Sequence, residues 1–298
     1  MKKQFQLILL LSFSVCSYGQ LKESQAIDSI FTEWNKTDVP GCSLGIIKEG
    51  QLIYAKGYGM ANMEYDIPNS ASSVFRIAST SKQFTAACVL LLAEKDKLDL
   101  DDNLKSFFSD FPDYAENISV RHLLNHTSGI RDYLQIAYLK GLGDDDFYVD
   151  DNIMKWLVNQ SDLNFLPGEE YLYSNSGYWL LGQIVQRVAG ISMADFAQKE
   201  IFKPLEMNNT HFHNDHTQIV KNRASGYVPV EKGNFKISMT TLDMIGDGGI
   251  FTTINDIKKW DDAFYNSTVL SQAFWQEMTK QGVLNNGEVI DYASGLMI

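Results

Sequence analysis

Ser79 and Lys82 are the two residues whose types and spacing most clearly suggest chemistry in this chain. Residues three apart on a helix lie on the same side, one turn apart, so the lysine can act directly on the serine hydroxyl. A free serine hydroxyl is a weak nucleophile and needs such a base. The pattern Ser-x-x-Lys is weak by itself, because two fixed positions in four residues arise often by chance. Apolar residues follow at helical intervals and predict a buried helix that opens at this pair: Phe84, Ala87, Cys88, Leu91 and Leu92.

Three more segments, far apart in the chain, strengthen this interpretation. Tyr-Ser-Asn at 173–175 follows a turn signal at 166–170 and precedes an amphipathic helix, so its tyrosine and asparagine can point together into a cleft. The segment 123–130 is typical of a helix end that runs into a turn. Thr253 and Asp256 have the spacing of a helix N-cap with a carboxylate in the first turn.

In this order, the four features resemble the serine β-lactamase-related family: class C β-lactamases, DD-peptidases and the esterases built like them. The resemblance covers nearly everything from about residue 22 to the end. It implies that Ser79 is the acylated nucleophile with Lys82 beside it, that Tyr173 is the partner general base or acid, and that Asn175 contacts the substrate. Class A enzymes carry Ser-Asp-Asn as their second motif. The Tyr-Ser-Asn of this chain is similar to the class C type instead.

The resemblance implies an exported serine hydrolase that works through an acyl-enzyme on an amide or an ester. A β-lactam, a D-Ala-terminated peptide and a simple ester all present a suitable acyl carbon, so the expected partner is a small-molecule or peptide substrate. No metal or organic cofactor is expected. We also expect the Lys82 ammonium to lower the pKa of the Tyr173 phenol. The alternative is a catalytically inactive penicillin-binding-like module that lacks a complete oxyanion hole.

The family's third motif, a Lys-Thr-Gly or His-x-Gly strand that borders the site and supplies part of the oxyanion hole, has no match after Tyr173. The chain stops in an apolar run at 292–298, which resembles the inside of a strand. We therefore expect a chain truncated at its C-terminus, with the last strands of the sheet missing.

The predicted fold class is α+β, an antiparallel sheet flanked by helices with an inserted all-helical lobe. Residues 22–36 predict an amphipathic helix, and 42–60 a hairpin. From Ser79 onward the pattern is mostly helical, and the helical lobe is expected at about 79–240. The serine hydrolase domain would span 20–298. In the resembling family the catalytic cleft lies between the sheet and this lobe.

The N-terminus has the form of a signal peptide at residues 1–19, and it predicts a periplasmic or secreted protein. Two lysines precede an apolar stretch that is too short to span a bilayer, and Ser17 and Gly19 offer small residues for cleavage. A lipid anchor on Cys16 is disfavoured because residues 13–15 make a poor lipobox.

Composition excludes other classes of function. The net charge is −12 and basic clusters are absent from the sequence, which argues against nucleic acid as a partner. No other segment is apolar enough over a sufficient length to span a membrane, and the sequence does not indicate an oligomeric state. Cys42 and Cys88 are expected to be buried, unpaired thiols, although an exported compartment would permit a disulfide.

Two other motifs imitate catalytic signatures. Ser43 stands in a Gly-x-Ser-x-Gly pattern, but that nucleophile needs a strand-to-helix turn and a hairpin follows instead, so we expect an ordinary strand residue. The segment 211–216 matches a His-x-His-x-Asp-His zinc signature, but further histidines are missing downstream. We expect it to form a surface loop without a catalytic zinc. His126 is expected to fix the turn before Gly129 through a hydrogen bond, and not to act as the base.

Overall fold

The computed structural model describes most of the 298-residue chain, namely residues 23–143, 146–231, 233–266 and 269–298. The predicted signal peptide and Cys16 lie outside these described residues. Within the described ranges, no helix combines the length and the apolar character that crossing a membrane requires.

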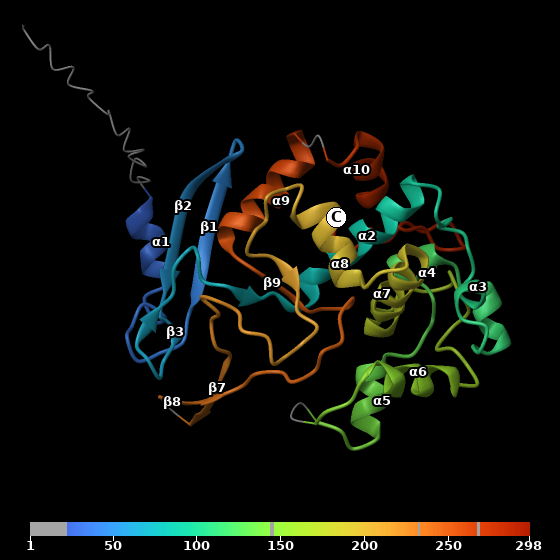
Figure 1. The fold of residues 1–298 in the computed structure, drawn as a ribbon, viewed down its shortest axis with the longest axis horizontal. Helices are drawn as coiled ribbons and strands as arrows, with labels where there is room; N and C mark the ends of the chain where they lie inside the picture. The colour runs from blue at the N-terminus through green and yellow to red at the C-terminus, as the bar shows by residue number, and fades with distance from the viewer. Residues whose placement is uncertain (1–22, 144–145, 232, 267–268) are drawn as a thin grey trace, which may run out of the picture.

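An antiparallel hairpin stands at one end of the molecule, on the left in Figure 1. Its strands are β1 (Cys42–Lys48) and β2 (Gln51–Tyr58), close to the prediction. Both residues of the turn at 49–50 have positive φ, 51° and 71°, which suits the twist of a two-residue hairpin turn. Helix α1 (Ser24–Ile30) lies beside the hairpin and is shorter than the predicted helix at 22–36.

The other strands are short and antiparallel. They pair in three small sheets: β3 (Met60–Asn62) with β4 (Ile67–Pro68); β9 (Ile250–Thr252) between β5 (Phe75–Arg76) and β6 (His211–Phe212); and β7 (Tyr227–Glu231) with β8 (Asn234–Ile237). The predicted α+β class is confirmed. In the part of the chain that is described, however, the strands form separate small sheets and not one continuous sheet.

Helices make up the rest of the fold. In chain order they are a 3₁₀ turn at Ala78–Ser81, α2 (Lys82–Glu94), α3 (Leu104–Phe107), a 3₁₀ turn at Asp113–Asn117, α4 (Val120–Leu124), α5 (Tyr133–Leu139), α6 (Asp150–Val158), α7 (Asn175–Ala189), α8 (Met193–Ala197), a π-helical turn at Gln198–Phe202, α9 (Ile254–Asn266) and α10 (Gln272–Met278). The helical stretch ends at Phe202, earlier than the predicted boundary near 240, because three short strands lie between 211 and 237.

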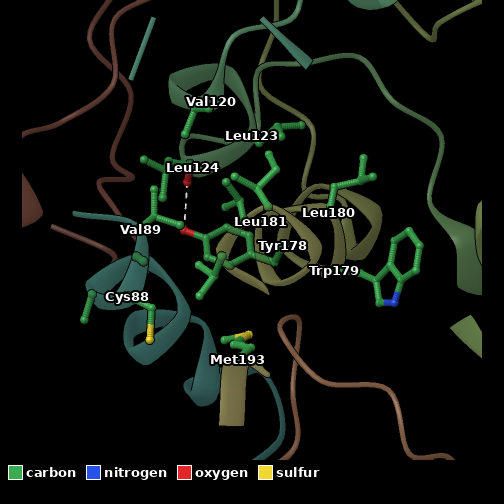
Figure 2. Packing of buried hydrophobic residues seen from close by; sticks show 14 of the residues in the cluster. Cys88, Val89, Val120, Leu123, Leu124, Tyr178, Trp179, Leu180, Leu181 and Met193 are labelled. Carbon is green, nitrogen blue, oxygen red and sulfur yellow. Dashed lines mark hydrogen bonds between the residues drawn. The ribbon is translucent and has the colours of Figure 1, made fainter. Parts of the chain in front are cut away.

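Helices α2 and α7 form the centre of the core and pack against each other. Figure 2 shows Val89 of α2 beside Tyr178 of α7, and the Tyr178 hydroxyl donates a hydrogen bond to the Leu124 carbonyl at 2.8 Å. Helix α2 is buried on nearly every side because its residues are apolar around the whole circumference. The first turns of α2 and α7 are thereby held in fixed positions, and these turns carry the chemical residues.

The two cysteines differ in environment. Cys88 is fully buried in α2, as expected, whereas Cys42 is only half-buried in β1. Both are free thiols.

Candidate active site

Ser79 lies in the 3₁₀ turn that leads directly into α2, and its side chain is exposed. The residue before it, Ala78, has φ of +46°, a left-handed conformation that L-residues other than glycine and asparagine seldom adopt. Such strain costs on the order of 1–3 kcal/mol and persists only where the surrounding structure imposes it. The turn presents the serine hydroxyl at the surface while the following residue on the same side, Lys82, is 1% exposed.

The Lys82 ammonium connects the segments that the sequence singled out. Its Nζ donates to Ser79 Oγ at 3.3 Å, to Asn175 Oδ1 at 2.9 Å and to the Asp247 carbonyl oxygen at 2.6 Å. An ammonium has three donors, so all three are used. The same Nζ lies 4.8 Å from the centroid of the Tyr173 ring. The structure therefore brings all four predicted site residues together around one buried nitrogen.

Burial changes the proton affinity of this nitrogen. It lowers the pKa of Lys82 to about 8, although the nearby carboxylates of Asp247 and Asp132 act in the opposite direction. Desolvation disfavours the charged form of a lysine, and the two acidic groups recover only part of that loss. A lysine with this pKa is partly neutral just above neutral pH, so it can accept a proton from the serine.

Tyr173 does not behave as the sequence suggested. Burial raises the pKa of its phenol, and a hydrogen bond with Ser79 only partly opposes this effect. The expectation of a lowered pKa is wrong because the ammonium faces the ring of Tyr173 and the tyrosine is itself partly desolvated. The tyrosine is 38% exposed and its ring centroid lies 4.4 Å from that of His126. Tyr173 is therefore a neutral phenol at neutral pH.

Asp132 is a residue of the site that the sequence analysis missed. It caps α5 by accepting a hydrogen bond from Leu134 N at 2.8 Å through Oδ1. Its Oδ2 accepts from both the backbone N–H and Nδ2 of Asn175, at 2.6 and 2.8 Å. This double contact leaves the Asn175 carbonyl oxygen pointing at Lys82. An aspartate before a helix gives a sequence signal for the cap, but not for the contact across 43 residues.

Asp247 and Tyr133 form a second buried pair beneath the site. Tyr133 Oη donates to Asp247 Oδ2 at 2.8 Å, and burial raises the pKa values of both groups. The backbone carbonyl of Asp247 is the one that accepts from Lys82. Gly246 and Gly249, with φ of 113° and 95°, bend the chain around this residue. The glycine-rich run at 246–249 is the sequence feature that could have indicated this bend.

The His126 side chain holds the Tyr-Ser-Asn segment at 173–175 and not the turn before Gly129, so the expectation is corrected on this point. Its Nδ1 accepts from the Ser174 N–H at 3.2 Å and its carbonyl accepts from Leu172 N at 3.0 Å. Its Nε2 lies 3.2 Å from Tyr292 Oη. Burial, followed by the Lys82 charge, lowers the pKa of His126 to about 3. The imidazole is thus neutral and fixes the backbone on which Tyr173 stands.

A cavity of about 170 Å³ opens at these residues. Ser79 and Asn175 line it, and so do Tyr133, Asp247 and Gly248. Lys82 is buried next to the cavity, where it can reach the serine while most of its surface stays away from solvent.

Comparison with known proteins identifies this arrangement. The family model described as Beta-lactamase matches residues 27–298. The chain belongs to this family. The predicted resemblance to the serine β-lactamase-related family is therefore confirmed.

Two curated relatives and one solved structure show the relationship in more detail. The chain is 32% identical over 264 residues to penicillin-binding protein 4* of Bacillus subtilis (strain 168), covering 84% of this chain and 57% of the relative. It is 27% identical over 258 residues to a D-aminopeptidase of Gluconobacter oxydans (strain 621H), covering 86% and 48%. The octameric penicillin-binding protein homologue from Pyrococcus abyssi has a TM-score of 0.80 at 27% identity, covering 93% of this chain and 65% of that one. The chain thus spans about half the length of the curated relatives it matches.

The two imitating motifs of this β-lactamase-family chain lie elsewhere in the fold. Ser43 is an ordinary residue of β1, as expected, and its hydroxyl donates to the Ser70 carbonyl at 2.7 Å.

The surface loop predicted at 211–216 is wrong in part, because His211 and Phe212 form strand β6 and pair with β9. His213 is buried there, with Nδ1 3.2 Å from Nε2 of His211. Among the described residues, no group of three or more His, Cys, Asp or Glu side chains is arranged to hold a metal ion.

Proposed function

We propose that this protein is a serine hydrolase in which Ser79 is acylated by an amide or ester substrate. The observation that carries the proposal is the contact of 3.3 Å between Ser79 Oγ and a buried Lys82 Nζ whose pKa is about 8. A strongly perturbed lysine beside an exposed hydroxyl at a cavity is the arrangement expected for an activated nucleophile.

The proposed reaction has two halves. Neutral Lys82 accepts the proton of Ser79 as Oγ bonds to the carbonyl carbon, and the proton passes by way of the Tyr173 hydroxyl to the leaving group as its bond to that carbon breaks. Water then attacks the acyl carbon and gives one proton to the same pair. The bond between that carbon and Oγ breaks, the pair passes this proton to Ser79 Oγ, and the acid product leaves. Tyr173 suits the acid step because its raised pKa keeps it protonated.

Anion stabilisation in the first half would come from backbone N–H groups. The N–H of Ser79, in the 3₁₀ turn that precedes α2, is one candidate donor because the first N–H groups of a helical segment are left unpaired. In the resembling family the second donor comes from the third-motif strand, whose triplet has no match in this sequence. The alternative function is a catalytically inactive penicillin-binding-like module, and acylation of Ser79 distinguishes the two.

The proposed substrates are a β-lactam, a D-Ala-terminated peptide or a simple ester, with Asn175 at the edge of the cavity as a substrate contact. The names of the two curated relatives, a penicillin-binding protein and a D-aminopeptidase, support the amide class. No metal or organic cofactor takes part in this mechanism, so chelator treatment should leave hydrolysis unchanged. We also propose export to the periplasm or the medium, which N-terminal sequencing of the mature protein would test by finding a start near residue 20.

Labelling with a fluorophosphonate or a slow β-lactam, followed by intact mass and peptide mapping, tests the central claim. We expect one adduct, on the peptide that contains Ser79, and no adduct with Ser79→Ala. Ser43→Ala is the matched control and should label normally. Labelling that survives Ser79→Ala would refute the assignment, and a folded protein that never reacts would favour the inactive module.

A further inference from the structure

A larger groove of about 470 Å³ adjoins the cavity at Ser79. The two share the lining residues Arg76, Leu134 and Leu242, so they lie side by side. We call the larger one the arginine groove, because Arg76 and Arg223 are the charged residues among the described residues that line it. A ligand that reaches Ser79 would have this groove beside it.

The charge of the groove contrasts with that of the protein. The chain carries a net charge of −12, yet no acidic residue is among the described residues lining the groove. Asp146 lies three residues from the lining residue Gly143, but it is not a lining residue itself, and its carboxylate accepts the Gly143 N–H at 2.7 Å. The charge carried by the described lining residues of the groove is thus positive.

Neither guanidinium has a side-chain hydrogen bond or an ion pair within the described part of the chain. The Nε of Arg223 is in addition buried and without a partner. A buried polar group without a partner is costly, and each such group in a folded protein calls for an explanation. Burial, followed by the charge of Arg76, lowers the pKa of Arg223, so the second arginine is close enough to repel the first. Among the described residues, the two neighbouring guanidinium groups thus have donors available to an anion.

Backbone pairing brings both arginines close to Phe251. Arg76 in β5 is directly opposite Phe251 in β9, and residues directly opposite in an antiparallel pair project to the same face. The Arg223 guanidinium lies 4.9 Å from the centroid of the Phe251 ring. An isolated bridge between Val74 and Arg223 holds the two chain segments side by side. The convergence is therefore built into the backbone pairing.

Arg76 also connects the groove with the nucleophile. A Cβ placed on Gly248 would lie 3.7 Å from Nη2 of Arg76 and 3.7 Å from the carbonyl oxygen of Ala78, the residue before Ser79. Gly248 itself lines the cavity at Ser79. The guanidinium of Arg76 therefore lies where the two spaces adjoin, close to the turn that carries Ser79.

We propose that the arginine groove binds a carboxylate of the substrate, so that the enzyme prefers acyl substrates with an anionic group next to an apolar body. Guanidinium groups match carboxylates in geometry and pair with them strongly. The apolar body is favoured because Phe75, Leu134, Leu242 and Phe251 also line the groove. This inference rests on the proposed function, since it takes the substrate to be one that acylates Ser79.

Two matched ester pairs test the inference. The carboxylate is on the acyl side in mono-p-nitrophenyl glutarate, with p-nitrophenyl valerate as its neutral partner. It is on the leaving group in 4-acetoxybenzoate, with the methyl ester of that compound as neutral partner. We expect kcat/KM to favour the carboxylate in at least one pair by about tenfold, the usual scale of a charged hydrogen bond. Arg76→Gln and Arg223→Gln should each remove most of that preference, measured as the ratio of kcat/KM within a pair.

Arg187→Gln is the matched control, because Arg187 lies near the end of α7, stacked on Phe108, and should keep the preference. Arg76 is exposed, so Arg76→Gln provides the test even if Arg223→Gln fails to fold. Equal kcat/KM within both ester pairs, or a preference that survives both arginine substitutions, would overturn the inference.

A binding measurement separates this inference from the proposed function. Ser79→Ala should bind the glutarate monoester more tightly than the valerate ester in calorimetric titrations, and adding Arg76→Gln should abolish the difference. If the unmodified protein hydrolyses no ester but Ser79→Ala still shows this difference, the proposed function fails and the carboxylate site stands. If hydrolysis by Ser79 is seen without any difference in binding or in rate, the carboxylate site fails alone.

Discussion

Asp132 holds Asn175 at two points, because one carboxylate oxygen accepts both the backbone N–H and the side-chain Nδ2 of the asparagine. This contact turns the amide oxygen towards Lys82, from which it accepts a hydrogen bond at 2.9 Å. Asp132 thus acts on the lysine in two ways, through the orientation of Asn175 and through its own negative charge, which raises the pKa of Lys82. The pH dependence of the reaction should report both.

The rate should rise with pH through the pKa of Lys82. A general base works in its neutral form, and the pKa of this lysine is lowered to about 8. We expect kcat/KM on a neutral ester to rise up to about pH 8 and then to level off, and we call this rise the limb of the pH profile. Lys82→Ala should remove this limb and most of the activity, on the order of 10²-fold or more. Lys95→Ala, in the exposed end region of α2, is the control. An unchanged limb in Lys82→Ala would exclude the lysine as the titrating group.

Asp132→Asn should move the same limb to lower pH. The substitution keeps an oxygen for the helix cap but removes the negative charge that favours the lysine's charged form. The apparent pKa of kcat/KM should therefore fall below that of the unmodified protein, with an unchanged melting temperature as evidence of folding. Asp195→Asn, which alters an acidic residue in α8, should leave the limb where it is. A shift to higher pH would contradict the proposed electrostatics.

Tyr173→Phe should cost about 10²-fold or more in kcat, because it removes the hydroxyl that passes the proton and keeps the ring. The neighbouring Tyr171→Phe is the matched control, since Tyr171 is equally exposed and also packs against His126. Turnover on esters with good and poor leaving groups should be compared, because a proton donor matters most for the poor ones. Near-normal kcat on both kinds of ester would rule out the acid–base role.

Acid should destabilise the protein through His126. Its pKa is about 3 in the folded state and 6.5 in the reference state, so between these values the unfolded chain binds more protons. The stabilisation is fully present above pH 6.5 and is lost as the pH falls towards 3. This single group should lower the free energy of unfolding by about 2 kcal/mol between pH 7 and pH 5.

Urea midpoints at the two pH values measure this effect, with His126→Asn as the variant. Asparagine tolerates the φ of +59° at this position, so backbone strain is avoided. Between pH 7 and pH 5, the free energy of unfolding of His126→Asn should fall by about 2 kcal/mol less than that of the unmodified protein. His122→Asn controls for a second histidine, which lies four residues earlier in α4. Equal pH sensitivity in His126→Asn and the unmodified protein would show that His126 does not carry the effect.

The sequence predicted the residues that belong to recognisable motifs, and it missed those that act through distant contacts. Ser79 and Lys82 are three residues apart, so helical geometry alone relates them. Lys82 and Asn175 are 93 residues apart, and only the family resemblance related them before the structure did. Asp247 contributes a backbone carbonyl from 165 residues away, an atom that every residue type carries. A contact of that kind leaves no pattern in composition or spacing.

Strands, too, could be predicted where their partners are adjacent in the chain and not where the partners are distant. The hairpin at β1 and β2 was predictable because two long strands and their turn are adjacent in the chain. Strand β6 was not, because His211 and Phe212 form a strand only where β9 supplies the hydrogen-bonding partner. Desolvation at Tyr173 was equally hidden, since burial of a side chain depends on the whole fold and not on its neighbours in sequence.

Cys88 makes the rigidity of the catalytic helix measurable. It lies on α2 six residues after Lys82, is fully buried, and burial raises the pKa of its thiol, so a thiol reagent in solution has neither access to it nor a thiolate to attack. Modification at this position requires the helix to separate from the core. The rate of that modification under native conditions therefore reports how often the support of the reactive lysine opens. A substrate that makes the site more rigid would therefore slow the modification of Cys88, although the substrate does not contact that sulfur atom.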